Sequence, residues 1–220
     1  MKIGVLGATG PAGSALAVRL ASVGYDVIVG SRSKYKALEV RDKLCDRWSD
    51  RELPIEAGTN DAAATESEVV VIATPWDAAS ATAASVSKQL AGKVVITMAN
   101  ALVKVGHEFQ PLVPPRGSVS GHVQAAIPKS YVAAAFHHVP AKELGDLDVP
   151  VDFDVLVCSD HRAATNTTFD IVRRIPNMRP LDAGELSNAA AIEAFTAVLL
   201  QLNVRYKTRA ALKLTGIDAS

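Results

Sequence analysis

Two short runs of the chain are apolar almost throughout: VVVIAT at residues 69–74 and KVVITM at residues 93–98. A strand that is covered on only one face alternates between apolar and polar residues. A strand buried on both faces reads instead as a continuous hydrophobic run, and such strands belong to parallel sheets with helices on each side. The two runs therefore predict an α/β fold around a buried parallel sheet.

Short apolar runs and segments with helical spacing alternate along most of the chain. Leu16, Leu20 and Val23 recur at intervals of four and three, which predicts a helix that Gly24 ends. This rhythm of strand and helix predicts a doubly wound, mostly parallel Rossmann-type sheet with a small C-terminal α/β extension. We expect strands over residues 3–6, 26–30, 53–57, 69–74, 93–98, 130–137, 153–158 and 179–182, and further helices over residues 37–48, 161–174 and 186–206.

The rhythm loosens after residue 98. Three prolines and a glycine between residues 111 and 117 predict a long irregular connection there. A second break at residues 145–150 predicts a domain boundary. We therefore expect a first domain over residues 1–145 and a small C-terminal domain over residues 146–220.

The charges of the chain balance, with 23 Lys and Arg against 23 Asp and Glu. A zero net charge gives no general attraction to nucleic acid or to an acidic membrane, so we expect small-molecule partners. Cys45 and Cys158 lack metal-type spacing, and we interpret them as reduced thiols of a cytoplasmic protein without a metal site. No apolar stretch approaches the roughly 18 residues that a membrane span needs.

The first predicted strand leads directly into GATGPAG, residues 7–13. In a dinucleotide-binding fold this loop needs glycine for a tight turn, for backbone approach to a pyrophosphate and for close packing of helix on strand. The N–H groups that open the next helix then bind the phosphates. Ala8 stands where the common G-x-G-x-x-G pattern has glycine, and an ordinary glycine-rich turn is the alternative. The strand before and the helix after favour a dinucleotide site on Gly7, Gly10 and Gly13.

The end of the second predicted strand indicates which dinucleotide binds. NAD sites usually place Asp or Glu about 20 residues past the glycines, on the ribose 2′-hydroxyl. This chain has GSRSKYK at residues 30–36, with no acid. Ser31 and Thr9 offer hydroxyls, Arg32 a planar fork of donors, and Lys36 a positive charge. A solvated basic helix start is the alternative, but beside the glycine loop the pattern favours NADP.

Five stretches of the chain resemble the NADP-dependent oxidoreductases of coenzyme F420, an 8-hydroxy-5-deazaflavin. The resemblance implies hydride exchange between NADPH and the deazaflavin, and a homodimer or higher homo-oligomer. It also implies that Thr9, Gly10, Pro11, Ala12, Ser31, Arg32 and Lys36 hold the nucleotide, with Thr74 and Ala78 at the same site. The stretches are GATGPAG (7–13), VGSRSKYK (29–36), TPWDAA (74–79), AFHHVPAKELGDLD (135–148) and RPLDAGELSNAAAIEAFTAVLLQLN (179–203), of which the last two are the most specific.

For hydride transfer between two flat rings, the protein must place the rings correctly and exclude water, and it need supply little side-chain chemistry. The rings approach to about 3–3.5 Å, so we expect an apolar slot at the carboxyl ends of the strands, lined in part by Val139 and Ala141. Asn100 is expected to bind the nicotinamide ribose or amide. His137 is a candidate to hydrogen-bond a deazaflavin carbonyl or to carry a proton, and a packed strand-end histidine is its alternative. The domain over residues 146–220 is expected to close this site and to contribute to oligomerisation.

Other interpretations stay open. The chain has no Tyr-x-x-x-Lys, which disfavours a short-chain dehydrogenase, and its last long helix has no lysine before Arg205, which disfavours a 3-hydroxyacid dehydrogenase. Another NADPH-dependent reductase, of an imine or a flavin, is the alternative enzyme. A non-catalytic NADP sensor would share Ser31 and Arg32 but would not need a second, apolar pocket.

Overall fold

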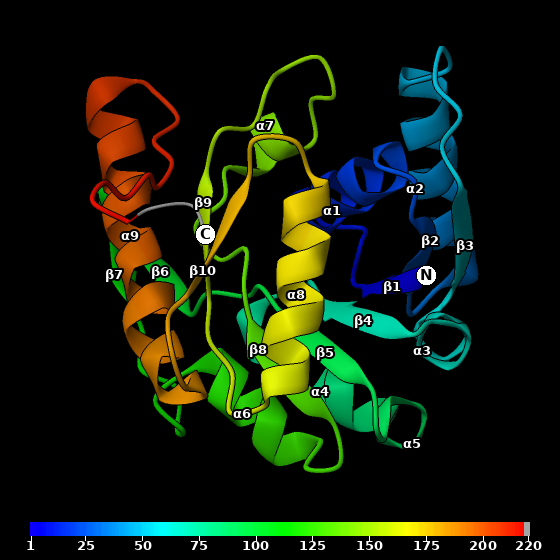
Figure 1. The fold of residues 1–220 in the computed structure, drawn as a ribbon, viewed down its shortest axis with the longest axis horizontal. Helices are drawn as coiled ribbons and strands as arrows, with labels where there is room; N and C mark the ends of the chain where they lie inside the picture. The colour runs from blue at the N-terminus through cyan, green and yellow to red at the C-terminus, as the bar shows by residue number, and fades with distance from the viewer. Residues whose placement is uncertain (218–220) are drawn as a thin grey trace.

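The structure is a computed structural model that describes residues 1–217. At its centre lies a six-stranded sheet whose strands are all parallel, in the order β3-β2-β1-β4-β5-β8 (Figure 1). The strand order reverses between β1 and β4, which is where doubly wound sheets open a ligand crevice. The strands are β1 (Lys2–Leu6), β2 (Asp26–Ser31), β3 (Ile55–Thr59), β4 (Val69–Ile72), β5 (Val94–Thr97) and β8 (Tyr131–Ala134).

Helices cover both faces of the sheet, so each face has its own hydrophobic core. All four residues of β4 are buried, as the continuous apolar run predicted. One core contains residues of α1 (Pro11–Ser22), α2 (Lys34–Arg47), α7 (Ala141–Leu144) and α8 (Arg162–Arg174). The other contains residues of α3 (Asn60–Glu66), α4 (Trp76–Ser85), α5 (Ser87–Leu90), α6 (Val119–Ala126) and α9 (Ala189–Tyr206).

The predicted C-terminal α/β extension is present and packs beside β8. Strand β9 (Asp154–Val157) pairs in parallel with β10 (Arg179–Asp182), and α8 connects them. An antiparallel bridge between Ala134 and Cys158 joins this pair to the central sheet. Val155 and Ile171 are buried in the same core as α1, so the extension and the central sheet share one hydrophobic interior.

The irregular connection predicted at residues 111–117 is present, since residues 112–118 form neither helix nor strand, but the wider segment after residue 98 is not irregular throughout. The segment contains an antiparallel hairpin, β6 (Leu102–Val105) with β7 (Glu108–Pro111), and then α6. Both hairpin strands are mostly exposed, so they carry no alternating apolar pattern. Helix α6 has only eight residues and is stabilised by Ser118, whose hydroxyl accepts a hydrogen bond from Gly121 N at 2.9 Å.

Several predicted boundaries shift by a few residues. Strand β3 begins at Ile55 because Pro54 precedes it and cannot donate a ladder hydrogen bond. Strands β4 and β8 end earlier than predicted, where the chain leaves the sheet to form the site. The last helix begins at Ala189, after a 3-10 turn over Leu186–Asn188. Among the helices of residues 1–217, none combines the length and the hydropathy that crossing a membrane requires.

Candidate active site

The glycine loop lies between β1 and α1, at the reversal of strand order. Gly7 has a φ of +79°, and a Cβ there would lie 2.9 Å from the Thr74 Cα, so only glycine fits. A Cβ on Gly13 would lie 2.9 Å from the Ala73 Cβ, so this glycine lets α1 approach the strand end. A Cβ on Gly10 would approach only the Gly7 carbonyl oxygen, at 3.8 Å. Gly13 therefore permits close packing of helix on strand, whereas the space beside Gly10 stays open.

Helix α1 opens onto this loop without a side-chain cap. Gly10 is its N-cap, Pro11 follows, and the first turn carries no acidic residue. The N–H groups of a helix start lack intrahelical partners and lie at the positive end of the helix dipole. The start of α1 is therefore suited to a phosphate group.

A cavity of about 830 Å³ lies on the outer side of the loop, and we call it the cationic cavity. Arg32 and Lys36 are exposed at its rim, and neither forms an ion pair with any side chain in residues 1–217. No carboxylate lines the cavity within the same range. Eight residues predicted for the nucleotide line it: Gly7, Thr9, Gly10, Ser31, Arg32, Lys36, Thr74 and Ala78.

Asn60, which was not predicted, lines the cationic cavity at the start of α3. Its Oδ1 atom and the Thr74 Oγ1 atom are buried without a hydrogen-bond partner in the described chain. Buried polar atoms are nearly always paired in proteins, so these two mark a place for ligand groups. Asn60 directly follows β3, and a polar residue just past a strand end is the signal that would have found it.

A second cavity, of about 450 Å³, lies on the inner side of the loop, and we call it the apolar cavity. The two cavities share Gly10, Ala73, Thr74 and Pro75, so they form one continuous crevice. Besides Gly10 and Thr74, six residues predicted for the site line the apolar cavity: Pro11, Ala12, Asn100, His137, Val139 and Ala141. Gly13 lines neither cavity. Residues 146–220 were expected to close this site, but the individual residues of the far wall were not predicted: they come mainly from α9 and the C-terminal tail and are Thr196, Leu199, Leu200, Asn203 and Ala210.

The wall that includes His137 begins with a strained turn after β8. Phe136 is fully buried and has a φ of +65°, which costs a bulky residue about 1–2 kcal/mol. The Val139 N–H donates to the Phe136 carbonyl at 3.3 Å and closes the turn. Strain of this kind persists only where surrounding contacts hold it.

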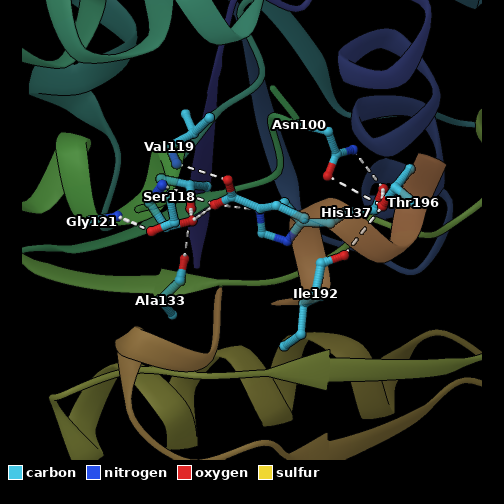
Figure 2. A network of polar contacts seen from close by, with 11 residues as sticks. Asn100, Ser118, Val119, Gly121, Ala133, His137, Ile192 and Thr196 are labelled. Carbon is cyan, nitrogen blue, oxygen red and sulfur yellow. Dashed lines mark hydrogen bonds and ion pairs between the residues drawn. The ribbon is translucent and has the colours of Figure 1, made fainter. Parts of the chain in front are cut away.

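Two side chains hold the carbonyl of His137 beside the apolar cavity. Asn100 Nδ2 donates to it at 2.8 Å, and the Thr196 hydroxyl lies 3.3 Å from both that carbonyl and Asn100 Oδ1. Figure 2 shows Asn100 and Thr196 on this side of His137, with the imidazole ring extending the opposite way. Asn100 was predicted to bind the nicotinamide ribose or amide. In the structure its side-chain amide forms hydrogen bonds within the protein.

The ring of His137 is fully enclosed. Its Nε2 lies 3.8 Å from Glu193 Oε1, and neither ring nitrogen has a hydrogen-bond partner among residues 1–217. Burial, with a smaller contribution from His138, lowers the pKa of His137 to about 3. The imidazole is therefore neutral at neutral pH, so its approach to Glu193 is not an ion pair. His138 faces a different neighbour, with its Nε2 3.0 Å from the Asp154 carbonyl.

Glu193, a buried residue of α9, binds the start of α6. Its Oε2 accepts from Val119 N at 2.7 Å, and its Oε1 accepts from Ser120 N at 3.0 Å and from the Ser120 hydroxyl at 2.8 Å. The Thr97 hydroxyl lies 2.6 Å from the Ser120 hydroxyl and extends this network to β5. Burial raises the pKa of Glu193, while these donors oppose the rise. Because both carboxylate oxygens accept hydrogen bonds, the geometry is that of the ionised form.

The C-terminal tail is held over the apolar cavity by a buried carboxylate. Asp154, at the start of β9, receives both Arg179 Nε at 2.9 Å and Arg179 Nη2 at 2.6 Å. It also accepts from Leu214 N at 2.6 Å, and its own N–H donates to the Leu212 carbonyl at 2.8 Å. These contacts lower the pKa of Asp154 despite burial, which by itself would raise it. They fix the tail that carries Ala210 to the cavity.

The residues present fit a phosphorylated dinucleotide followed by a flat ring. The exposed cations and the unpartnered Asn60 and Thr74 oxygens suit a polar ligand, and the walls of the second cavity are mainly apolar. No three His, Cys, Asp or Glu side chains within residues 1–217 are grouped to hold a metal ion. A glycine loop at the reversal of a doubly wound sheet, with two joined cavities, defines a Rossmann-type nucleotide-dependent oxidoreductase.

Comparison with known proteins specifies the family. The model of the family described as "NADP oxidoreductase coenzyme F420-dependent" matches residues 2–101. The F420-dependent NADP reductase of Methanocaldococcus jannaschii is 36% identical over 99% of this chain and 100% of its own length. The enzyme of the same name from Methanothermobacter marburgensis is 36% identical over 99% of both chains. The chain belongs to the F420-dependent NADP reductase family.

A solved structure supports the fold. The crystal structure of a candidate F420-dependent NADP-reductase from Arthrobacter sp. FB24 superposes with a TM-score of 0.83, at 24% identity, over 98% of this chain and 99% of that one. The likeness extends through the C-terminal extension as well as the central sheet. It confirms the doubly wound architecture predicted from the sequence.

Proposed function

We propose that this protein exchanges a hydride between NADP(H) and coenzyme F420. The observation that carries the proposal is the continuous crevice, whose two cavities share Gly10, Thr74 and Pro75 at the reversal of the sheet. A dinucleotide that lies along the glycine loop extends from the cationic cavity into the apolar one. The nicotinamide supplies the hydride chemistry, and the protein holds the two rings together and excludes water.

For the nucleotide, we propose binding by the loop and by the end of β2. Gly7, Thr9, Gly10, Pro11, Ala12 and Gly13 form or pack the loop at the uncapped start of α1. Arg32 and Lys36 bind the 2′-phosphate, with Ser31 beneath them. The absence of a lining carboxylate within residues 1–217 favours NADP over NAD.

For the deazaflavin, we propose the apolar cavity between the loop, the turn after β8 and α9. Val139 and Ala141 form one wall, and the residues of α9 form the other. The backbone carbonyl of His137 belongs to this wall, whereas its enclosed ring supports the turn from behind. A proton-carrying role for His137 requires the ring to leave that position, so we assign the ring a structural role.

We further propose that residues 146–220 close this site and that two copies of the chain associate through α9. The outer face of α9 exposes Phe195, Val198 and Leu202, with Val198 half exposed. A helix that presents such side chains requires apolar cover. We expect a cytoplasmic homodimer or larger homo-oligomer, with small molecules and not nucleic acid as its other partners. Light scattering after size exclusion tests the oligomer, and a monomeric mass would contradict it.

The function is tested by mixing the purified protein with NADPH and oxidised F420 and following the visible absorbance of the deazaflavin. Loss of absorbance with NADPH, and much slower loss with NADH, is the expected result. FMN in place of F420 is the control for a general flavin reductase. Protein that binds NADPH but leaves F420 oxidised would overturn the proposal and favour an imine reductase or a sensor.

A further inference from the structure

Glu193 is a buried carboxylate on α9, the helix that forms the far wall of the apolar cavity. Its residue is 4% exposed, and its oxygens receive three hydrogen bonds, all from the first turn of α6. Hydrogen bonds to a charged acceptor at a helix start are stronger than neutral ones. The carboxylate therefore ties α9 firmly to α6.

The same carboxylate faces the turn that carries His137. His137 contacts Glu193 and also lines the apolar cavity: its ring is 3.8 Å from Glu193 Oε1, and its carbonyl is held by Asn100 and Thr196 (Figure 2). Thr196 lies one turn after Glu193 on the same helix. A displacement of the carboxylate would therefore move the cavity wall in two ways: through contact with the His137 ring, and through a shift of α9, which carries Thr196.

The backbone at this point cannot hold its conformation unaided. Phe136 precedes His137 in the left-handed region, with a φ of +65°. A strained residue keeps its conformation only when its neighbours are fixed. The elements that fix the neighbour His137 are Asn100 after β5, Thr196 on α9 and Glu193 behind the ring.

We propose that Glu193 is a positioning residue for the deazaflavin half of the site. Its carboxylate fixes α9 and the His137 ring, and so the position of the Thr196 hydroxyl and the His137 carbonyl, which lie 3.3 Å apart in one wall of the apolar cavity. The inference rests on the proposed function, because the apolar cavity is taken to hold the F420 ring. The cationic cavity, which is proposed to hold the phosphates of NADPH, shares no residue with this network, so F420 binding should depend on the network far more than NADPH binding does.

The test is the dissociation constant of F420, measured by its fluorescence without NADP present, in wild-type protein and in Glu193→Gln. The amide keeps the size of the side chain but opposes one of the backbone N–H donors of α6 with its own N–H. We expect F420 binding to weaken roughly 10-fold, with NADPH binding unchanged within about 2-fold. Glu185→Gln, the same change at an exposed position four residues before α9 begins, is the control and should alter neither constant.

Two further variants separate positioning from folding. Ser120→Ala removes one of the three donors to Glu193 and should weaken F420 binding by about 3-fold even if Glu193→Gln does not fold. Thr196→Val removes the cavity-side hydroxyl. If Glu193 acts through this wall, the F420 effects of Glu193→Gln and Thr196→Val in the double variant fall short of their sum.

The outcomes distinguish the inference from the proposed function. Wild-type protein that does not bind F420 refutes both. Wild-type protein that binds F420, with Glu193→Gln and Ser120→Ala binding it equally well, refutes only the positioning role. Variants in which the melting temperature falls while both dissociation constants stay at wild-type values show that Glu193 is structural, and also refute it. Equal weakening of F420 and NADPH binding has the same consequence.

Discussion

The two cavities of the crevice are built in opposite ways. The cationic cavity takes its predicted determinants mainly from two short local segments, the glycine loop and residues 31–36, with Asn60 and Thr74 beside them, and its charged side chains are exposed. The apolar cavity is assembled from segments nearly 100 residues apart, such as Asn100 and Thr196, and is supported by enclosed polar groups. Substitutions on the cationic side should therefore change ligand affinity alone, whereas those behind the apolar side should change affinity and stability together.

The largest effect is expected behind the apolar cavity, at Asp154. Replacing it by Asn leaves Arg179 without its carboxylate and loosens the tail that carries Ala210. We expect the free energy of unfolding to fall by about 3 kcal/mol, measured by urea denaturation, because a buried pair loses one partner. Binding of F420 should weaken, and binding of NADPH should not. Asp152→Asn, at an exposed carboxylate bonded to Lys213, is the control and should change stability little.

On the cationic side of the crevice, the largest loss of NADPH affinity is expected from a substitution at Gly7. Gly7→Ala imposes a left-handed conformation on alanine and drives its Cβ into Thr74, so the loop must move. We expect NADPH to bind at least about 100-fold more weakly, as measured by titration of NADPH fluorescence. Gly92 also has a positive φ, of +77°, but a Cβ there meets nothing within 4 Å. Gly92→Ala should therefore destabilise the fold modestly without changing NADPH affinity; an equal loss at both positions would mean that strain alone matters.

Arg32 tests the cationic cavity at a single ligand group, the 2′-phosphate that NADPH has and NADH lacks. Arg32→Ala removes a planar donor fork, and we expect NADPH binding to weaken about 30-fold while NADH binding stays within about 2-fold. Calorimetric titration of both nucleotides measures the difference. Arg41→Ala, on helix α2 and paired with Asp42, is the control. Equal weakening of NADPH and NADH binding would make Arg32 a structural residue and remove the support for NADP.

The smallest expected effect is on the pH dependence of the free energy of unfolding. Burial lowers the pKa of His137 from 6.5 to about 3, so between these values the unfolded chain binds a proton that the folded chain does not. The free energy of unfolding should therefore decrease as the pH falls below about 6.5, by up to about 1.4 kcal/mol per pH unit from this residue. Urea denaturation across this range measures the slope. His137→Gln should flatten it and the exposed His107→Gln should not; an unchanged slope in His137→Gln would place the ring in water.

The sequence was sufficient where a property depends on neighbours along the chain. Continuous apolar strands predicted the parallel sheet, and Gly7 with its following helix predicted the loop. The hairpin over residues 102–111 was missed because its strands are exposed and carry no apolar pattern. Boundaries shifted where strands end at the crevice, since hydrogen bonding and not hydropathy decides the last residue of a strand.

The far wall of the apolar cavity was not predictable in the same way. Thr196, Asn203 and Ala210 reach the cavity only through packing of α9 and the tail on the rest of the chain. The left-handed conformation of Phe136 has no local signal either. Glu193, in contrast, has a local signal in the sequence. It is the only charged residue between Asn188 and Arg205, in a helix that is otherwise largely apolar. A lone carboxylate in such a helix predicts a buried partner, and the partner here is the start of α6.

Direct transfer between two rings that meet at Gly10 and Thr74 is tested most directly with an isotope. NADPH that carries deuterium at the transferred position of its nicotinamide is mixed with oxidised F420 and the protein in ordinary water. The joined cavities exclude water from the transfer, so the deuterium should appear in the reduced deazaflavin and not in the solvent. Deuterium released to water, or a reduced deazaflavin that carries only protium, would show that the two rings do not meet in this crevice.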